Sequence, residues 1–283
     1  MPGSPNRPSA SAPPKRCWRK FHVDLGISGR WAVVCASSQG LGLACAQALL
    51  AEGVNVVVNG RSAAKLEAVA AELRATPGCR GEVVAAAADI TTPEGRAALL
   101  AAAPTVDILV TNNAGPKPGT IADITEEDLA EALRLHFHAP IALVKALLPA
   151  MKEQGFGRIV NITSAMVKRP SSHMIASAGA RAGQSAVMKA VSLEVARFNV
   201  TINNLLPERI DSPRQDFMAK REVDQLGITY DEARQRQSDS IAAKRLGLPS
   251  EFGAACAFLC SAQASFISGV HLHLDGGSYP GLV

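Results

Sequence analysis

A glycine-containing turn between an apolar strand and a helix is the part of this 283-residue sequence best suited to bind a ligand. The segment Cys35–Gly42 reads CASSQGLG and follows an apolar run at Trp31–Ala36. Gly40 and Gly42 let the backbone approach a phosphate closely, and the helix that follows presents free N–H groups and a partial positive charge. Its place between a first strand and a first helix predicts a site for the pyrophosphate of a dinucleotide.

Alternating elements must position this turn. Amphipathic helical stretches separate seven apolar runs that predict strands, at Trp31–Ala36, Val54–Asn59, Glu82–Ala87, Val106–Thr111, Arg158–Thr163, Val200–Leu206 and Val270–Leu274. The longest helix is expected between about Met174 and Phe198. Nearly continuous apolar strands that alternate with helices are typical of a parallel sheet covered on both faces. We therefore predict an α/β fold, a single doubly wound Rossmann-type sheet of about seven strands, over residues 24–283.

One segment breaks the alternation. Residues 209–245 are charged and irregular, with a weak helical pattern around Asp231–Gln237. A long insert before the last helix is typical of a lid, and we expect this segment to cover a site.

The composition argues against two classes of partner. Residues 1–23 hold five basic residues and no acidic one, so the rest of the chain carries one more acidic than basic residue although the net charge is +4. A nucleic-acid-binding domain carries its positive charge on the folded body, and no apolar run reaches the roughly 18 residues of a membrane span. We expect neither nucleic acid nor membrane as a partner.

The N-terminal tail and the cysteines bear on location. Residues 1–23 are basic and rich in Pro and Ser, and we predict that they are disordered. The six cysteines show no CxxC pair and no zinc spacing, so we expect no metal site. Reduced, buried thiols fit a cytoplasmic protein.

Several motifs together resemble those of the short-chain dehydrogenases/reductases. The turn at Cys35–Gly42 is similar to the TGxxxGxG loop of that family, with Cys35 and Ala36 at the Thr and first Gly positions. Four further motifs and one matching pair follow in the family's order and spacing, namely Asp89-Ile90, Asn112–Gly115, Gly157–Ser164, Val200–Asn203 and Asp275–Gly277. The resemblance covers about residues 24–283 and points toward the 3-oxoacyl-(acyl-carrier-protein) reductase branch.

The resemblance implies which residues contact the dinucleotide. They are Ala36, Ser38, Gly40, Leu41 and Gly42 in the first loop, Asp89, Ile90, Asn113, Ala114 and Gly115 after later strands, and Arg181, Pro207, Ile210 and Ser212 near the nicotinamide. NAD-preferring members have an acid where this chain has Gly60, and the neighbouring Arg61 is placed to pair with a 2′-phosphate. We therefore predict NADP(H) as the cofactor. Glu208 departs from the family's usual Gly in the nicotinamide segment.

The catalytic centre departs further from the family. Family members transfer hydride between the nicotinamide and a carbonyl carbon, with a Ser that orients the carbonyl, a Tyr that donates the proton and a Lys four residues later. Ser164 matches the Ser, but Ser177 and Arg181 stand at the Tyr and Lys positions. The pair still shares one helix face, because residues i and i+4 lie together. Arginine cannot relay protons, and loss of a general acid typically lowers the rate by about 10² to 10⁴-fold.

Another group could supply the proton. Lys168 lies four residues after Ser164, and His136 stands at the position of the family's catalytic Asn. We hypothesise that Lys168 or His136 takes over part of the acid role. Weaker candidates are His138, His173, Tyr230 and Tyr279.

These residues predict an NADP-dependent reductase of a ketone or aldehyde, either a small molecule or a carrier-bound compound of the acyl or polyketide type. Two alternatives stay open, since fold does not fix function. One is a non-redox enzyme on this scaffold, such as an isomerase, dehydratase or cyclase, and the other is a binding protein with an inactive site. The resemblance also implies a homodimer or homotetramer.

Overall fold

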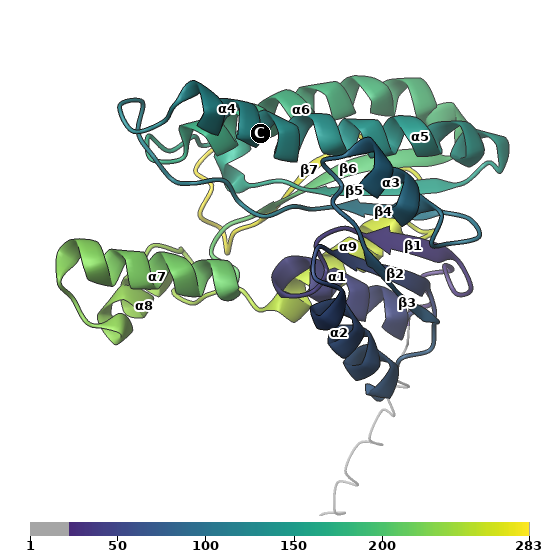
Figure 1. The fold of residues 1–283 in the computed structure, drawn as a ribbon, viewed down its shortest axis with the longest axis horizontal. Coiled ribbons are helices and arrows are strands. Elements are labelled where there is room, and N and C mark those ends of the chain that lie inside the picture. The colour runs from purple at the N-terminus through teal and green to yellow at the C-terminus, as the bar shows by residue number, and fades with distance from the viewer. Residues whose placement is uncertain (1–22, 283) are drawn as a thin grey trace, which may run out of the picture.

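A parallel sheet of seven strands forms the centre of the structure, a computed structural model that describes residues 23–282 (Figure 1). The strands are β1 (Trp31–Val34), β2 (Asn55–Gly60), β3 (Val83–Ala87), β4 (Ile108–Thr111), β5 (Gly157–Ile162), β6 (Val200–Pro207) and β7 (His271–Leu274). Their order is β3-β2-β1-β4-β5-β6-β7, and all neighbours run parallel. The order reverses between β1 and β4, where doubly wound folds bind ligands. The predicted fold class is confirmed.

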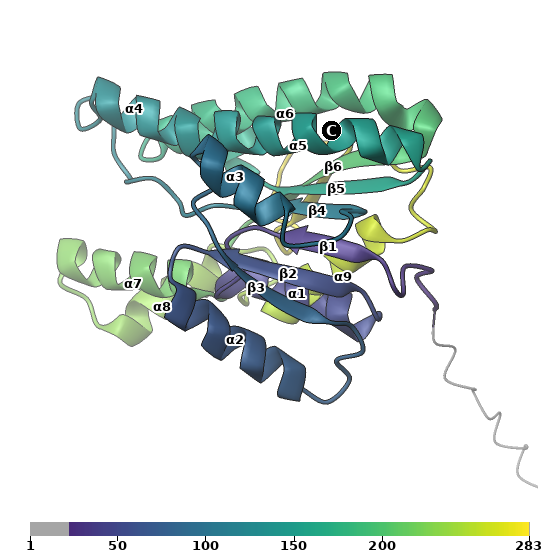
Figure 2. The same ribbon diagram turned by 45° about the vertical axis from the view of Figure 1, so that its right-hand side comes forward.

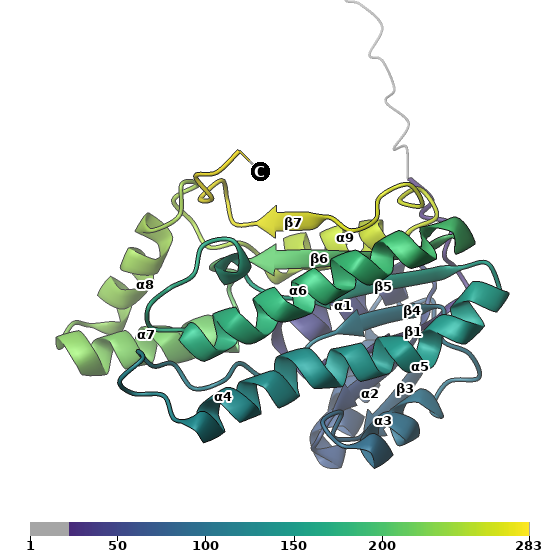
Figure 3. The same cartoon turned by 90° about the horizontal axis from the view of Figure 1, so that it is seen from above.

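Helices cover both faces of this sheet (Figures 1 and 2). One face carries α1 (Gly40–Ala51), α2 (Ala63–Ala75) and α9 (Pro249–Cys260), and the other carries α3 (Pro93–Leu100), α4 (Glu126–Leu133), α5 (Ala139–Glu153) and α6 (Ile175–Val195). Figure 3 shows α5 and α6 side by side across the central strands. Each face has its own apolar core, and all six residues of β5 are buried between the two. The two cores hold the strand ends rigidly, which fixes the loops that follow them.

The first strand is shorter than predicted. It ends at Val34 rather than Ala36, because Ala36 has a φ of 47° and turns the chain out of the strand. The limits of the other strands differ from the prediction by no more than two residues.

The segment 209–245 is more regular than predicted. It contains two helices, α7 (Pro213–Leu226) and α8 (Tyr230–Asp239). The helical pattern around Asp231–Gln237 is confirmed as part of α8, whereas α7 was not predicted. Gly227, with a φ of 65°, ends α7, and a capping box between Thr229 and Glu232 begins α8. The apolar pattern gave no sign of α7 because Ala219 is its one buried residue. The pair, called here the α7–α8 hairpin, extends away from the body of the protein in Figures 1 and 3.

Two expectations concern the rest of the chain. The predicted disorder of residues 1–23 falls, apart from Val23, outside the residues that the structure describes. Within residues 23–282 no helix combines the length and the apolar character needed to cross a bilayer.

Candidate active site

The glycine loop brings α1 directly against the end of β1. A Cβ added to Gly42 would lie 2.4 Å from the carbonyl oxygen of Ala36, so only glycine fits there. Ala36 adopts the left-handed conformation at the position where the family has glycine, at a cost of about 1 kcal/mol. Gln39, the residue that precedes α1, provides no side-chain cap, which leaves the first N–H groups of the helix for an anion. The loop thus fits the pyrophosphate of a dinucleotide, with Ser38, Gly40 and Leu41 half-buried at its surface.

Arg61 and Asp89 face the same space at the ends of β2 and β3. The pKa of Asp89 is lowered chiefly by hydrogen bonds from Thr91, and the charge of Arg61 contributes to the shift. A Cβ on Gly60 would lie 3.5 Å from the Ser38 hydroxyl oxygen, an ordinary contact distance, so position 60 lies directly beside the glycine loop. The sequence interpretation missed Lys65, whose ammonium contacts the Gln39 side chain. Its position four residues after Arg61, in the first turn of α2, could have indicated it.

A buried polar network holds the floor of this region, and the sequence interpretation did not find it. The Asn59 side chain donates hydrogen bonds to the carbonyls of Ala86 and Ala88, both 3.1 Å long, and accepts one from the Ala36 amide. The Ser37 hydroxyl accepts a hydrogen bond from the Asn59 amide at 2.8 Å. This network ties the carboxyl ends of β1, β2 and β3 together. A polar residue inside the apolar run Val54–Asn59 was the available signal.

The motif after β4 connects the glycine loop to the helical layer. Asn112 donates a hydrogen bond to the Ala36 carbonyl, and Asn113 donates one to the Leu135 carbonyl, each 3.4 Å long. Ala114 and Gly115 are exposed at the mouth of the site. Ile90 is buried and lines a small cavity with Asn113 and His136.

Arg181 joins the two helical candidates to the end of β5. Its Nε donates a hydrogen bond of 3.2 Å to the Ser177 hydroxyl oxygen. Its Nη1 donates to the carbonyl oxygens of Ile162, at 2.9 Å, and Thr163, at 2.7 Å. These carbonyls directly precede Ser164, so one guanidinium fixes the helix that carries Ser177 against the segment that carries Ser164.

The charge of Arg181 persists although it is buried. No acidic side chain pairs with it among residues 23–282, and burial together with the charge of Arg214 lowers its pKa to about 10. The group is therefore protonated at neutral pH and places a fixed positive charge beside Ser177. The half-buried Ser164 accepts a hydrogen bond from the Met166 amide at 3.2 Å. Its hydroxyl proton can still be donated to a ligand.

His136 lies in a π-helical turn, η1 (Arg134–His138), between α4 and α5. The side chain is buried, and its Nε2 has no hydrogen-bond partner among the described residues. Burial lowers its pKa well below 6.5, the charges of Arg181 and Arg214 add to the effect, and a hydrogen bond to the Ala114 backbone opposes it. The imidazole is neutral at pH 7, which argues against an imidazolium acid at this position. π-Helical turns are frequent at functional sites.

Protonation of His136 is expected to make the protein less stable in mild acid. The pKa of the folded state lies below the ordinary value of 6.5, so the unfolded chain binds more protons below that pH. The stability is fully present above about pH 6.5 and falls toward the folded pKa, by at most about 1.4 kcal/mol per pH unit. Urea unfolding at several pH values should show a shallower loss for His136→Asn than for the wild type. The matched control is His138→Asn, an exposed neighbour, and equal acid sensitivity of wild type and His136→Asn would contradict this explanation.

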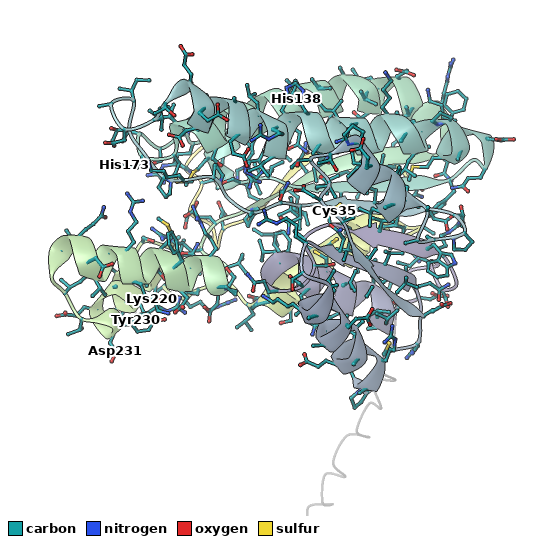
Figure 4. The ribbon with its side chains drawn as sticks, viewed as in Figure 1. Cys35, His138, His173, Lys220, Tyr230 and Asp231 are labelled. Carbon is teal, nitrogen blue, oxygen red and sulfur yellow. The ribbon has the colours of Figure 1, made fainter. Side chains whose placement is uncertain are left out.

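Among the described residues, no hydrogen bond joins the acid candidates Lys168 and Tyr230 to Ser164. Lys168 is exposed beyond the short helix η2 (Ala165–Val167), and its charge lowers the pKa of His271 on β7. Figure 4 shows Tyr230 on the α7–α8 hairpin, on the side away from the body, where its hydroxyl contacts Asp216.

The three remaining weaker candidates belong to other parts of the surface. Tyr279 stacks on His273, with 4.5 Å between ring centroids. His138 and His173 are exposed on the body of the protein.

The segment after β6 lies partly against the glycine loop. Pro207 ends β6 and Ser212 precedes α7, and a Cβ on Gly40 would lie 4.0 Å from Ser212. Glu208 instead lines a second cavity, of about 290 Å³, together with Ile210. Burial raises the pKa of Glu208. Ser212 therefore lies beside the glycine loop, whereas Glu208 and Ile210 line a neighbouring cavity.

Arg214, which the sequence interpretation did not single out, also lies in this site. A Cβ added to Gly115 would be 3.3 Å from its guanidinium carbon, and its charge lowers the pKa values of Arg181 and His136.

Comparison with known proteins agrees with this geometry. Residues 35–279 match the family model described as enoyl-(acyl carrier protein) reductase. The NADPH-dependent reductase BacG of Bacillus subtilis is 29% identical over 89% of this chain and 98% of its own length. The 3-oxoacyl-(acyl-carrier-protein) reductase FabG of Vibrio cholerae is 30% identical over 90% of this chain and 99% of its own.

Solved structures extend the comparison. L-sorbose reductase from Gluconobacter frateurii, complexed with NADPH and L-sorbose, has a TM-score of 0.86 and 29% identity over 92% of this chain and 100% of its own. An actinorhodin polyketide ketoreductase with NADPH has a TM-score of 0.81 and 28% identity over 88% of this chain and 97% of its own. With the glycine loop, the seven-stranded sheet and the Ser164 segment, these matches show that the chain belongs to the short-chain dehydrogenases/reductases and has 3-oxoacyl-(acyl-carrier-protein) reductases among its relatives.

Proposed function

We propose that this protein is an NADP-dependent reductase of ketones or aldehydes in which Ser164, Ser177 and Arg181 form the catalytic centre. The observation that carries the proposal is the guanidinium of Arg181, which joins Ser177 to the carbonyls that precede Ser164. A site without function would not need a buried cation, since burying an unpaired charge is unfavourable.

NADP(H) is the cofactor, as in the NADPH-dependent and NADPH-bound relatives. The glycine loop fits its pyrophosphate, because the first N–H groups of α1 have no side-chain cap. Arg61 and Lys65 provide two cations for the 2′-phosphate, with the Ser38 hydroxyl between the glycine loop and Gly60. Asp89 lies on the adenine side of the same groove.

The residues of the chain divide the chemistry as follows. NADPH supplies a hydride to the carbonyl carbon when it is bound. Ser164 donates a hydrogen bond to the carbonyl oxygen and orients it. Ser177 gives its hydroxyl proton to that oxygen, Arg181 stabilises the negative charge left on Ser177, and water restores the proton. Lys168 stays an alternative proton source, because it is exposed four residues from Ser164.

The substrate is a ketone or aldehyde, either small or carrier-bound and of the acyl or polyketide type. Relatives named for L-sorbose, for 3-oxoacyl carriers and for polyketides support this range. The α7–α8 hairpin starts beside Gly40 of the glycine loop and extends away from the body, and we propose that it closes over the substrate as a lid.

Titration of the purified protein with NADPH and NADH, followed by fluorescence, tests the proposal. Tight binding of NADPH should be followed by its oxidation with members of a carbonyl panel. A protein that binds no nicotinamide nucleotide would contradict the proposal and favour an inactive binding protein. Nucleotide binding without hydride transfer to any carbonyl would favour a non-redox enzyme.

Arg61→Ala is expected to weaken NADPH binding roughly 10 to 100-fold and to leave NADH binding within about twofold. The reason is that a hydrogen bond to a charged group is worth about 1.5–3 kcal/mol and NADH lacks the 2′-phosphate. Both dissociation constants can be measured by fluorescence titration. Arg80→Ala, an exposed arginine just before β3, is the matched control. If Arg61→Ala weakened the binding of NADPH and NADH equally, Arg61 would not be the residue that recognises the 2′-phosphate.

A further inference from the structure

Arg214, in the first turn of α7, is a half-buried cation without an acidic partner. No hydrogen bond or ion pair engages its guanidinium within the described part of the chain, and its nearest recorded ring is Phe217, 5.3 Å from the guanidinium carbon to the ring centroid. Burial lowers its pKa, and the charge of Arg221 adds to the effect. A cation held this way is unfavourable unless an anion meets it.

Three other cations of the α7–α8 hairpin are paired with acids. The ion pairs are Lys220 with Asp216 at 2.8 Å, Arg234 with Asp211 at 2.6 Å, and Arg236 with Glu222 at 2.5 Å. The acids nearest to Arg214 along the chain, Asp211 and Asp216, therefore already have basic partners. Acidic residues are thus present near Arg214 in the sequence, but they pair with other basic residues.

The position of Arg214 joins two loops at the switch point of the sheet. Its guanidinium lies against Gly115 in the loop after β4, because an added Cβ there would be 3.3 Å from the guanidinium carbon. The preceding Pro213 lies 3.7 Å from a Cβ built on Gly40 in the glycine loop. The Arg214 side chain therefore lies against the loop after β4, while the residue before it contacts the glycine loop at the start of α1.

A second cation, which is buried, lies near enough to Arg214 for the two charges to interact. Arg181 has no acidic partner among the described residues, and the charge of Arg214 lowers its pKa. The positive charges of Arg181 and Arg214 repel each other, and an anion bound between them would replace this repulsion by attraction to both groups. Guanidinium groups bind the paired oxygens of phosphates with two parallel hydrogen bonds.

We propose that Arg214 binds the pyrophosphate bridge of the cofactor and draws the α7–α8 hairpin over the dinucleotide. The inference rests on the proposed function. We favour the pyrophosphate because the glycine loop is suited to bind it and because Pro213, the neighbour of Arg214, lies beside Gly40 of that loop. A carboxylate or phosphate on the substrate has the same chemistry, and the experiment separates the two sources.

The test compares wild type, Arg214→Gln and Arg221→Gln as purified full-length proteins. Arg221 lies two turns further along α7, so its replacement removes the same charge about 10 Å away. The probes are NADPH and adenosine 2′-monophosphate, which carries the 2′-phosphate but no pyrophosphate. Dissociation constants come from fluorescence for NADPH and from calorimetry for the monophosphate.

Arg214→Gln should weaken NADPH binding at least about tenfold and leave binding of the monophosphate within about twofold, which also shows that the variant is folded. Arg221→Gln should change NADPH binding less than about threefold. NADPH binding that is unchanged in Arg214→Gln would overturn the proposal, and a rise confined to the KM of the carbonyl compound would assign Arg214 to the substrate instead. Wild-type protein that binds neither probe would contradict the proposed function itself.

Discussion

Arg181→Met is expected to lower kcat/KM for carbonyl reduction at least about 100-fold while the protein stays folded. The guanidinium holds Ser177 through a 3.2 Å hydrogen bond, and in the proposed mechanism its charge stabilises the negative charge that develops there. Removing one preorganised donor from such a site typically lowers kcat by about 10² to 10³-fold. The free energy of unfolding should change by less than about 2 kcal/mol. The lost hydrogen bonds to Ile162 and Thr163 are offset by removal of a buried cation without an acidic partner.

The measurements are steady-state kinetics with the carbonyl compound that the wild type reduces fastest, and urea unfolding. Arg181→Lys is the matched control, because it keeps a positive charge but not the planar fork that binds two carbonyls and Ser177 together. We expect it to retain more activity than Arg181→Met. The pKa of about 10 keeps the guanidinium charged up to about pH 9, so assays near neutrality report the charged form. Wild-type kinetics in Arg181→Met would exclude Arg181 from the catalytic centre.

The fold could be predicted well because its evidence is local. Strands β2, β5 and β6 are mostly apolar segments bounded by turns. Such segments are typical of the buried strands of a parallel sheet, so each could be recognised on its own. The end of β1 was misjudged by two residues because Ala36 takes a left-handed φ that alanine rarely adopts. Helix α7 was missed because it is rich in charged residues and buries only Ala219, so its few apolar residues form no run that stands out in the sequence.

The site was predictable where motifs are contiguous and less so where residues meet through space. The glycine loop and the Ser164 segment are stretches of sequence with fixed roles. Arg214, by contrast, reaches the site only because α7 crosses the glycine loop, and no spacing rule connects it to Gly115. The charge state of His136 depends on burial and on two arginines far away in the sequence, so it could not be predicted from the residue type alone.

Ser164→Ala is expected to lower kcat about 100 to 1000-fold with little effect on NADPH affinity. The Ser164 hydroxyl accepts the Met166 amide, so its proton can be donated to the carbonyl oxygen, and this bond strengthens as negative charge develops there. Because the interaction is made mainly in the transition state, kcat and kcat/KM should fall together. Stopped-flow or steady-state oxidation of NADPH measures kcat, and fluorescence titration measures the affinity for NADPH.

Ser172→Ala is the control for the chemical change, since Ser172 is an exposed serine in the loop before α6. It should keep kcat within about twofold.

Ser177→Ala separates the two serine roles, because loss of a proton donor should change the pH dependence of kcat, whereas loss of an orienting donor should lower kcat at every pH. A Ser164→Ala protein with unchanged kcat and lost NADPH binding would instead make Ser164 a cofactor contact. In that case Ser177 and Arg181 would have to polarise the carbonyl alone, and Arg181→Met would then become the more severe variant.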